Sequence, residues 1–551
     1  MTVRQQEALD SLYALDNLLT IKIVLPQADW DALRTEAPKG GVCNFKWTGG
    51  ARFTWARASA VEIWGTNFPA RTTFTNVGVK KKSFCGSLDS EKPCLHLDFG
   101  RFTDVNAAAA EDLIGSRYLT LNNSIQDRSY IRQPLGYRLL AMAGLPHSRC
   151  NYARVFVNGT LIGDGFVGVN GPGIYVNAEP VMERYLERNF GNAGGNLYEF
   201  EHHDDFVIER VDFTSVEPPS AFENKADLTL ATRRIADDEL TGAAEVLDLD
   251  QFIKVYAMEF YLKHWDGYSG NTNNTYVYND VAAVEAPGVA NIRFKMIPWG
   301  IDQTLQPDRL FTLARGGLIA RLVRDDATRR EQLLDQVATF RETVFGRDIQ
   351  QTVLKQLIDQ MEAMLLGFGV PGVAVEITAV RRELRLAGSA GYLCAGLPVG
   401  NAVHLLDGFT GACLRASNTE AVPPGTANPT NFEVYHLALR GGDDAANLWS
   451  CDDLGSGKSF TSKAFPRVLH ASRQVTAQGH RYLYTCAPGN LDRAEEFSVV
   501  PVDSPDEFTF TGYFKLASVR TGERATYGMD LTPAGSARVH QEPEGSSLYF
   551  Y

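Results

Sequence analysis

Hydrophobic and polar positions alternate in short bursts over residues 18–66, as in the segments LTIKIVL and ASAVEIW. This period of two residues predicts β-strands at the edge of a mixed domain. Over residues 127–145 the apolar positions instead recur at spacings of three and four and stop at a glycine and a proline, which predicts a helix. Two further strand-like runs, 153–157 and 173–178, are joined through a glycine-rich segment.

The middle of the chain mixes helical and strand patterns. Residues 251–263 are apolar on most faces and predict a buried helix, and the segments TYVYND and NIRFKMIPW predict a second pair of strands. Amphipathic patterns over 331–345 and 347–366 predict two more helices. We therefore expect an α+β domain over residues 1–390 that ends in a helical subdomain at about 325–390, followed by a Gly-rich, nearly uncharged boundary.

The last part of the chain, residues 400–551, has short β-like periods separated by turn residues. Three similar short segments begin at Leu414, Leu469 and Leu516, and each precedes an aromatic-rich strand. Repeats of roughly 50 residues favour an all-β domain with a β-trefoil fold, whereas a single β-sandwich with chance similarities is the alternative. Trp449 is the only tryptophan here and no Gln-x-Trp occurs, so the ligand of this domain, a carbohydrate or a protein, stays open.

Length and charge exclude several classes of protein. The 551 residues are enough for about two to four domains, each with its own core. With 53 basic and 66 acidic side chains the net charge is −13, which argues against a nucleic-acid partner. No apolar stretch is long enough to span a bilayer, and Glu7, Asp10 and Asp16 lie where a signal peptide needs an apolar core. We expect neither a membrane span nor a secretion signal in this chain.

The metal-ligand residue types form no recognised zinc pattern. The 8 cysteines include no CxxC pair, so we expect most of them to be small buried hydrophobic residues, with Cys85 and Cys94 as the best candidates for a disulfide. The run from His202 to Asp205 contains four metal-ligand types. Consecutive residues point in different directions, however, so we expect a solvated loop there.

The most informative segment, HWDGYSGN, follows the predicted buried helix directly. It has the His-x-Asp-x4-Asn spacing of a protein-kinase catalytic loop, with Asp266 as the base and Asn271 as a metal ligand. An aspartate that accepts a hydroxyl proton must lie close to the γ-phosphate, and an asparagine further along the loop offers a neutral oxygen to Mg²⁺. The alternative for Asp266 is a turn aspartate in a polar loop.

A second acidic residue follows at the spacing that a kinase requires. Asp302, in the segment IPWGID, comes after the second predicted strand pair, where a kinase keeps its metal-binding aspartate. A carboxylate, a carboxamide and phosphate oxygens together would form a plausible Mg²⁺ shell. The order of helix, polar loop, two strands and second aspartate therefore favours a phosphotransferase.

These segments, together with others along the chain, resemble a known family. Over about residues 18–370 the chain is similar to the spore-coat CotH kinases, atypical protein kinases of spore coats, bacterial surfaces and some fungi. The matching segments include IVLPQADWDALR, KPCLHLDFGRF, LTLNNSIQDRSYIRQPLGYRLLAMAGLP, ARVFVNGTLIG, GIYVNAEPVMERYLERNFGNAGGNLYEFE, HWDGYSGNTNNTYVYND and MIPWGID. The resemblance implies an atypical protein-kinase-like fold, and it matches Asp266 and Asn271 to the catalytic loop.

The resemblance also implies further site residues. Glu179 matches the glutamate of the family's G-x-Y-x-x-x-E-P segment and should pair with a phosphate-binding lysine. Lys92 is the best match for that lysine, and the run from Lys80 to Lys82 is the fallback, although charge runs are usually solvated. The implied cofactors are ATP and Mg²⁺, and the implied partner is a coat or surface protein that offers Ser or Thr hydroxyls.

The sequence departs from the family at two places. The family's usual Pro-Trp-Asp-x-Asp has Gly300 in place of its first aspartate. The glycine-rich segment DGFVGVNGPG is also inserted before Glu179, either as a phosphate-covering loop or as a plain hairpin extension. Two functions therefore stay open: an Mg-ATP-dependent protein Ser/Thr kinase, or an impaired pseudokinase that serves in structure, adhesion or assembly. The resemblance places either protein on a spore coat, a cell surface or outside the cell.

Overall fold

The computed structural model describes most of the chain. The described residues are 2–47, 51–166, 168–218, 220, 224–282, 284–396, 399–400, 402–408, 413–420, 432–437, 444–475, 481–489, 493–502, 506, 508–531, 537–542 and 548–550. They divide into two compact units. Unit 1 consists of Met1–Gln306, Ala314–Leu333 and Gln351–Arg381, and unit 2 of Pro307–Leu313, Leu334–Gln350 and Arg382–Tyr551.

Unit 1 begins with an 8-stranded sheet whose described strands run in the order β1-β2-β3-β4-β5-β8-β6-β7. The strands are β1 (Leu19–Val24), β2 (Ala56–Trp64), β3 (Thr72–Lys81), β4 (Leu95–Asp98), β5 (Tyr118–Asn122), β6 (Cys150–Val157), β7 (Thr160–Leu161) and β8 (Ile174–Ala178). Strand β1 pairs antiparallel with β2 and also parallel with β6, so the sheet closes on itself. The strands predicted at 153–157 and 173–178 are confirmed as β6 and β8.

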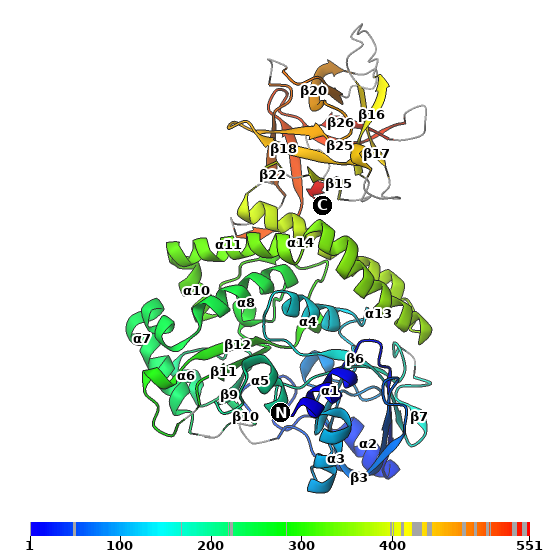
Figure 1. The fold of residues 1–551 in the computed structure, drawn as a ribbon, viewed down its shortest axis with the longest axis vertical. Coiled ribbons are helices and arrows are strands. Elements are labelled where there is room, and N and C mark those ends of the chain that lie inside the picture. The colour runs from blue at the N-terminus through cyan, green and yellow to red at the C-terminus, as the bar shows by residue number, and fades with distance from the viewer. Residues whose placement is uncertain are drawn as a thin grey trace. The chain divides into compact units, whose positions relative to one another are not determined.

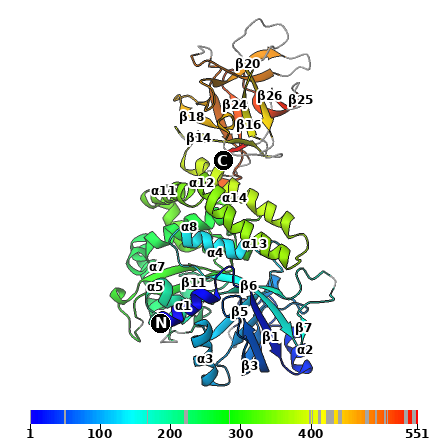
Figure 2. The same ribbon diagram turned by 45° about the vertical axis from the view of Figure 1, so that its right-hand side comes forward.

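Alternating apolar residues from these strands fill one hydrophobic core inside the closed sheet. The helices of this part are α1 (Val3–Leu12), α2 (Gln27–Thr35), α3 (Asp104–Ile114), α4 (Arg132–Met142) and α5 (Glu183–Phe190), with the short η1 (Cys85–Ser87). Helix α1 packs beside α3 in both views (Figure 1 and Figure 2). Helix α4 confirms the helix predicted within 127–145.

The second half of unit 1 contains a 4-stranded sheet in the order β10-β9-β11-β12, with every described pair antiparallel. Its strands are β9 (Leu197–Phe200), β10 (Ser215–Glu217), β11 (Thr275–Asn279) and β12 (Phe294–Pro298). The elements that accompany it are α6 (Ile208–Val211), α7 (Ala226–Val246), α8 (Leu249–Leu262), α9 (Tyr268–Asn271), η2 (Val289–Asn291), η3 (Ile301–Gln303) and α10 (Leu318–Asp325). Strands β11 and β12 confirm the second predicted strand pair.

Helix α8 is the buried helix that the sequence predicts. Asp248 caps its first turn by accepting a hydrogen bond from the backbone of Gln251, and 11 of its residues are buried. The helix ends at Lys263, which adopts a left-handed conformation with φ +53. The loop with the kinase-like spacing starts directly after this end.

The later helices are α11 (Ala327–Thr343), α12 (Arg347–Ile349), η4 (Gln350–Leu354), α13 (Lys355–Gly367) and α14 (Val373–Ala395). Helices α11 and α13 confirm the two amphipathic helices expected at 331–345 and 347–366. Among the described residues, no helix combines the length and the apolar character required to cross a bilayer.

Unit 2 is rich in strands, as the sequence predicts for residues 400–551. They are β13 (Phe311–Thr312), β14 (Ala402–Val403), β15 (Leu405–Asp407), β16 (Cys413–Glu420), β17 (Phe432–Leu437), β18 (Trp449–Asp453), β19 (Lys458–Ser462), β20 (Val468–Val475), β21 (Arg481–Cys486), β22 (Phe497–Pro501), β23 (Thr509–Phe510), β24 (Phe514–Ser518), β25 (Arg524–Leu531), β26 (Ala537–Glu542) and β27 (Leu548–Phe550), with η5 (Ala445–Asn447). The pairs β16–β17, β20–β21 and β25–β26 are antiparallel, and β17, β21 and β26 also pair with one another.

The repeat within unit 2 has a different register from the predicted one. Equivalent cross-strand pairs are Leu406↔Cys413, Thr461↔Val468 and Ala517↔Arg524. Their first members are 461 − 406 = 55 and 517 − 461 = 56 residues apart. Leu516 lies in β24, which corresponds to β15 and β19, whereas Leu414 and Leu469 lie in the next strands, β16 and β20. The segment that begins at Leu516 therefore lies one strand earlier in its repeat than the segments that begin at Leu414 and Leu469.

The expected Cys85–Cys94 disulfide is wrong. Cys85 is bonded to Cys43, at a sequence separation of 42, and Cys94 is a free, buried cysteine. Cys94 comes directly before β4, and burial raises the pKa of its thiol to about 11. No pattern in the sequence points to the correct pairing, because Cys43 lies in an irregular segment between α2 and β2.

Candidate functional site

A buried carboxylate shapes the loop that follows α8. Glu259, which is 3% exposed, accepts hydrogen bonds from the backbone N–H groups of Tyr268 (3.0 Å) and Ser269 (2.8 Å). Gly267 and Gly270 are required by close approach, since an added Cβ would lie 2.5 Å from Glu259 Oε1 and 2.0 Å from the Trp265 carbonyl oxygen respectively. The loop is therefore held in one tight conformation by its own sequence.

This loop presents Asp266 within a set of three carboxamides. Asp266 Oδ1 accepts from Asn271 Nδ2 (2.6 Å) and Asn273 Nδ2 (3.1 Å), and Oδ2 accepts from Asn274 Nδ2 (2.7 Å). The Oδ1 atom of Asn271 is buried without a hydrogen-bond partner in the described structure. A buried carbonyl oxygen without a donor is the type of group that a cation satisfies.

Asp302 lies on η3, just beyond β12, and is buried. Its Oδ2 accepts a hydrogen bond from Asn122 Nδ2 at 3.2 Å. Burial raises the pKa of Asp302 to about 6, and the charges of Asp127 and Asp266 add to this increase while the Asn122 bond opposes it. A bound cation would relieve the cost of the buried negative charge.

Asp266, Asn271 and Asp302 line the same cavity, which has a volume of about 1060 Å³. The structure thus brings together three of the five residues that the sequence singled out. The cavity also has an apolar wall formed by Leu121, Ala178, Pro180, Val181 and Met182. Its walls come from both sheets of unit 1.

Lys92 and Glu179 do not line this cavity, and they do not pair with each other. Lys92 Nζ donates to Tyr130 Oη (2.6 Å) and to the Asn170 carbonyl oxygen (3.0 Å), and burial lowers the pKa of this lysine to about 7. The lysine therefore anchors the glycine-rich segment that contains Asn170. It holds that segment from inside the protein.

Glu179 instead forms ion pairs with two arginines. Its oxygens lie 2.9 Å from Arg149 Nη2 and 2.5 Å from Arg188 Nη2. Burial raises the pKa of Glu179, but the two guanidiniums together lower it below the ordinary value. The expected Lys92–Glu179 pair is wrong, because the buried carboxylate is already neutralised by Arg149 and Arg188.

The cavity receives its lysines from the end of β3. Lys81 is 2% exposed and its Nζ donates to the backbone carbonyls of Arg34 and Glu36. Lys80 and Lys82 lie on the opposite face because side chains alternate along a strand. Lys82 is exposed, and its Nζ lies 5.4 Å from the centre of the Trp299 ring. The lysine run is therefore only partly a solvated face.

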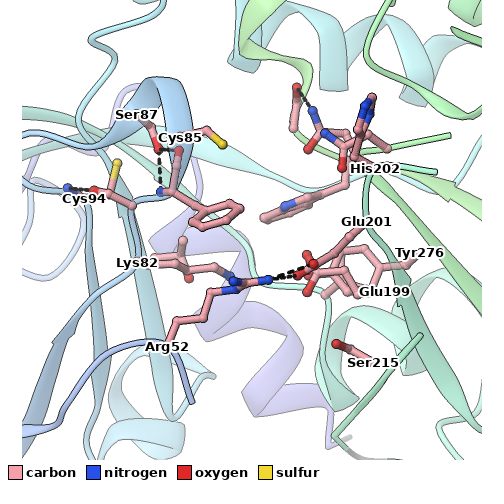
Figure 3. A pocket seen from close by; sticks show the side chains of 18 of the residues that line it. Arg52, Lys82, Cys85, Ser87, Cys94, Glu199, Glu201, His202, Ser215 and Tyr276 are labelled. Atoms are coloured by element: carbon pink, nitrogen blue, oxygen red, sulfur yellow. Dashed lines mark hydrogen bonds and ion pairs between the residues drawn. The ribbon is translucent and has the colours of Figure 1, made fainter. Parts of the chain in front are cut away.

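The sequence analysis did not identify a group of carboxylates on the 4-stranded sheet. Glu199 and Glu201 lie two residues apart at β9, and Glu217 ends β10. Figure 3 shows Arg52 and Lys82 reaching into the cavity from the side opposite Glu199 and Glu201. Arg52 Nη2 donates to both Glu201 oxygens at 3.1 and 2.8 Å. Burial, followed by the charge of Glu199, raises the pKa of Glu217.

The residues from His202 to Asp205 have separate roles. His202 lines the cavity and its ring lies 5.1 Å from that of Phe45. Asp204 pairs with Arg210, and Asp205 accepts from Tyr268 Oη at 2.6 Å. Within the part of the chain that the structure describes, no group of three or more His, Cys, Asp and Glu side chains forms a candidate metal site.

Gly300 lies beside the loop that carries Asp266 and Asn274. It adopts a left-handed conformation with φ +53, and an added Cβ would lie 2.3 to 2.7 Å from the side-chain atoms of Asn274. Residue 300 therefore borders the carboxamide of Asn274. Sequence reasoning identified the departure at Gly300 but not this neighbour.

Comparison with known proteins assigns the family. A model of the CotH kinase protein family matches residues 82–366, just over half of the chain. The chain belongs to the CotH kinase protein family. At the level of the family it is a kinase-like protein, with an α+β architecture. Among curated proteins, no match is found.

Several solved structures resemble about a quarter of the chain. The designed 3-fold symmetric protein ThreeFoil is 15% identical and covers 27% of this chain and 96% of its own, with a TM-score of 0.21. The SDF2-like protein from Arabidopsis thaliana is 14% identical over 28% of this chain and 93% of its own (TM-score 0.24). The Macrolepiota procera ricin B-like lectin is 12% identical over 28% and 95% (TM-score 0.20).

Proposed function

We propose that this protein is an Mg-ATP-dependent phosphotransferase that phosphorylates Ser or Thr hydroxyls of a coat or surface protein. The observation that carries the proposal is the single cavity lined by Asp266, Asn271 and Asp302. A proton acceptor, a neutral oxygen ligand and a second carboxylate are the parts that phosphoryl transfer requires.

The residues present fit a bound Mg²⁺. The Asn271 Oδ1 atom is buried without a partner, and Asp302 is a buried carboxylate whose pKa is raised to about 6. Asn271 and Asp302 would hold the ion, which when bound neutralises phosphate charge. Lys82, rather than Lys92, is the lysine that would contact phosphate oxygens, because it is exposed beside Trp299 at the cavity wall.

In the proposed reaction, the acceptor hydroxyl oxygen bonds to the γ-phosphorus of ATP as the bond from that phosphorus to the β–γ bridging oxygen breaks. ADP leaves, and the hydroxyl proton passes to Asp266. The hydrogen bonds from Asn271, Asn273 and Asn274 orient the Asp266 carboxylate. The apolar wall of the cavity would receive the nucleotide base.

The test is transfer of label from γ-labelled ATP to the protein itself or to a Ser/Thr-containing carrier protein. We expect transfer by the wild type, and a loss of at least about 100-fold in Asp266→Asn, since this change keeps the shape but removes the base. Asp112→Asn, an exposed aspartate on α3 with a side chain 66% exposed, is the matched control. Equal transfer by wild type and Asp266→Asn would disprove the assignment.

A second function is favoured by Gly300. Because this position lacks the carboxylate of the resembling sequences, the protein would then be a pseudokinase that acts in structure, adhesion or assembly on a coat or surface. Calorimetry separates the two, since binding of Mg-ATP would yield heat and stabilise the fold, whereas no binding would leave the structural role.

We also propose that the β-rich unit is a β-trefoil that binds a carbohydrate or a protein. The proposal is supported by the hairpins β15–β16, β19–β20 and β24–β25, whose equivalent pairs lie 55 and 56 residues apart, and by the mutual pairing of β17, β21 and β26. Trp449 is buried in the core of this unit, where its Nε1 donates to the Leu414 carbonyl, so it cannot stack on a sugar. A glycan array that shows no binding would leave a protein as the ligand.

A further inference from the structure

Asn274 is placed to determine which oxygen of Asp266 faces the acceptor. A carboxylate offers about four lone-pair positions. In the described structure, Asp266 Oδ1 accepts two hydrogen bonds, from Asn271 and Asn273, and Oδ2 accepts one, from Asn274. The remaining position is therefore on Oδ2. The carboxamide atom that faces the carboxylate must be the nitrogen, because an ionised carboxylate can only accept.

Two contacts fix Asn274 in this place. Its backbone carbonyl accepts from Trp299 N at 2.9 Å, and its Nδ2 lies 3.4 Å from the Gly300 carbonyl oxygen. Asn274 itself adopts a left-handed conformation with φ +45. The end of the loop is therefore attached to the segment that leads into η3 and Asp302.

Gly300 leaves the space that Asn274 occupies. An added Cβ would lie 2.3 Å from Asn274 Cγ, 2.4 Å from Oδ1 and 2.7 Å from Nδ2. Real Cβ atoms do not approach so closely, so any side chain at residue 300 would displace the carboxamide from Asp266. The hydrogen bond from Asn274 to Asp266 Oδ2 therefore requires that residue 300 has no side chain.

We propose that Asn274 is a positioning residue for Asp266, that Gly300 is the glycine that makes room for it, and that the acceptor hydroxyl donates to Asp266 Oδ2. This inference rests on the proposed phosphotransferase function. Under it, Gly300 is part of a rearranged site in which a carboxamide takes the place next to the base. The missing carboxylate is not by itself a sign of lost activity.

The test is a double-mutant cycle with Asn274→Ala and Gly300→Ala. In the wild type, we expect each single change to lower kcat by about 10- to 100-fold, with little change in the KM for ATP, because a misplaced base slows the chemical step but leaves nucleotide contacts intact. In the Asn274→Ala background, Gly300→Ala should lower kcat by less than about threefold, since the carboxamide it would displace is gone.

A control substitution at a second glycine distinguishes a steric clash from backbone strain. Gly191 has φ +78 and no atom within 4 Å of an added Cβ, so Gly191→Ala introduces the strain without the collision. Its effect should be the same in both backgrounds. Independent, multiplicative effects of Gly300→Ala and Asn274→Ala on kcat would overturn the inference.

The same cycle measured by urea unfolding needs no activity. Coupled losses of unfolding midpoint for Gly300→Ala and Asn274→Ala, with additive losses for Gly191→Ala, would support the placement of Asn274 even in a wild type that transfers no phosphate, and the proposed function alone would then fail. Additive losses for both glycines would overturn the inference.

Discussion

Asp302 should lower the stability of the protein at neutral pH, and Asp302→Asn should raise it. Burial raises the pKa of this carboxyl from the ordinary 3.8 to about 6. This difference corresponds to about 3 kcal/mol of unfolding free energy, because each factor of ten in proton affinity is worth about 1.4 kcal/mol. The asparagine keeps the size of the side chain and can still accept from Asn122.

The sign follows from proton binding. Between about pH 4 and pH 6 the folded state holds a proton on Asp302 that the unfolded state has released, so the stability of the wild type falls as pH rises through this window. Above pH 6 the full cost is present, and Asp302→Asn should then be more stable by up to about 3 kcal/mol. Near pH 3.8 the advantage should disappear.

The assay is urea unfolding at several pH values from 4 to 8, with Asp112→Asn as the exposed control. A variant that is no more stable than the wild type at pH 7, or stability curves that run parallel across the whole range, would refute the reasoning. Under the proposed function, Mg-ATP should raise the unfolding midpoint of the wild type but not that of Asp302→Asn, because the variant lacks the anionic ligand. Asp302 would then lower the stability of the fold while supplying an anionic ligand for Mg-ATP.

Four further variants test other parts of unit 1. Lys82→Met should weaken Mg-ATP binding about tenfold in calorimetry without changing the unfolding midpoint, whereas Lys92→Met should leave ATP affinity unchanged and alter only stability, because Lys92 is buried beside Tyr130. Removal of the disulfide in the double variant Cys43→Ser, Cys85→Ser should lower the free energy of unfolding by about 4 kcal/mol, because the bond closes a loop with a sequence separation of 42 residues. The unfolding midpoint of this variant should no longer respond to a reductant. Glu179→Gln should destabilise the fold by about 3 kcal/mol, seen as a lower thermal midpoint, because the half-buried Arg149 and Arg188 lose the buried carboxylate that faces both, although Arg149 keeps its ion pair with Asp10.

Local patterns in the sequence were sufficient for the elements that carry the site. The buried helix α8 and the pair β11 and β12 were predicted because their hydrophobic periods are long and regular. The loop between them was placed correctly because Asp266 and Asn271 follow a helix end. Spacing within one loop is local information, and the sequence contains it.

Partners that lie far apart in the chain were not predictable in the same way. Glu179 is compatible with any nearby cation, and its choice of Arg149 and Arg188 depends on how β8, β6 and α5 come together. Cys43 pairs with Cys85 across 42 residues of irregular chain and strands. Such pairings depend on the closed sheet, and no spacing rule encodes them.

The lysines illustrate how strand geometry decides a role that composition leaves open. Three consecutive lysines look equivalent in the sequence, and all three line the cavity. Alternation along β3 nevertheless buries Lys81, whose Nζ donates to two backbone carbonyls, while Lys82, the residue after β3, is exposed. Lys92 carries a single positive charge in a matching segment, but it lies inside the protein, where Tyr130 and the Asn170 carbonyl satisfy it. Under the proposed function, the register of β3 therefore decides which of the three lysines is exposed to contact a phosphate.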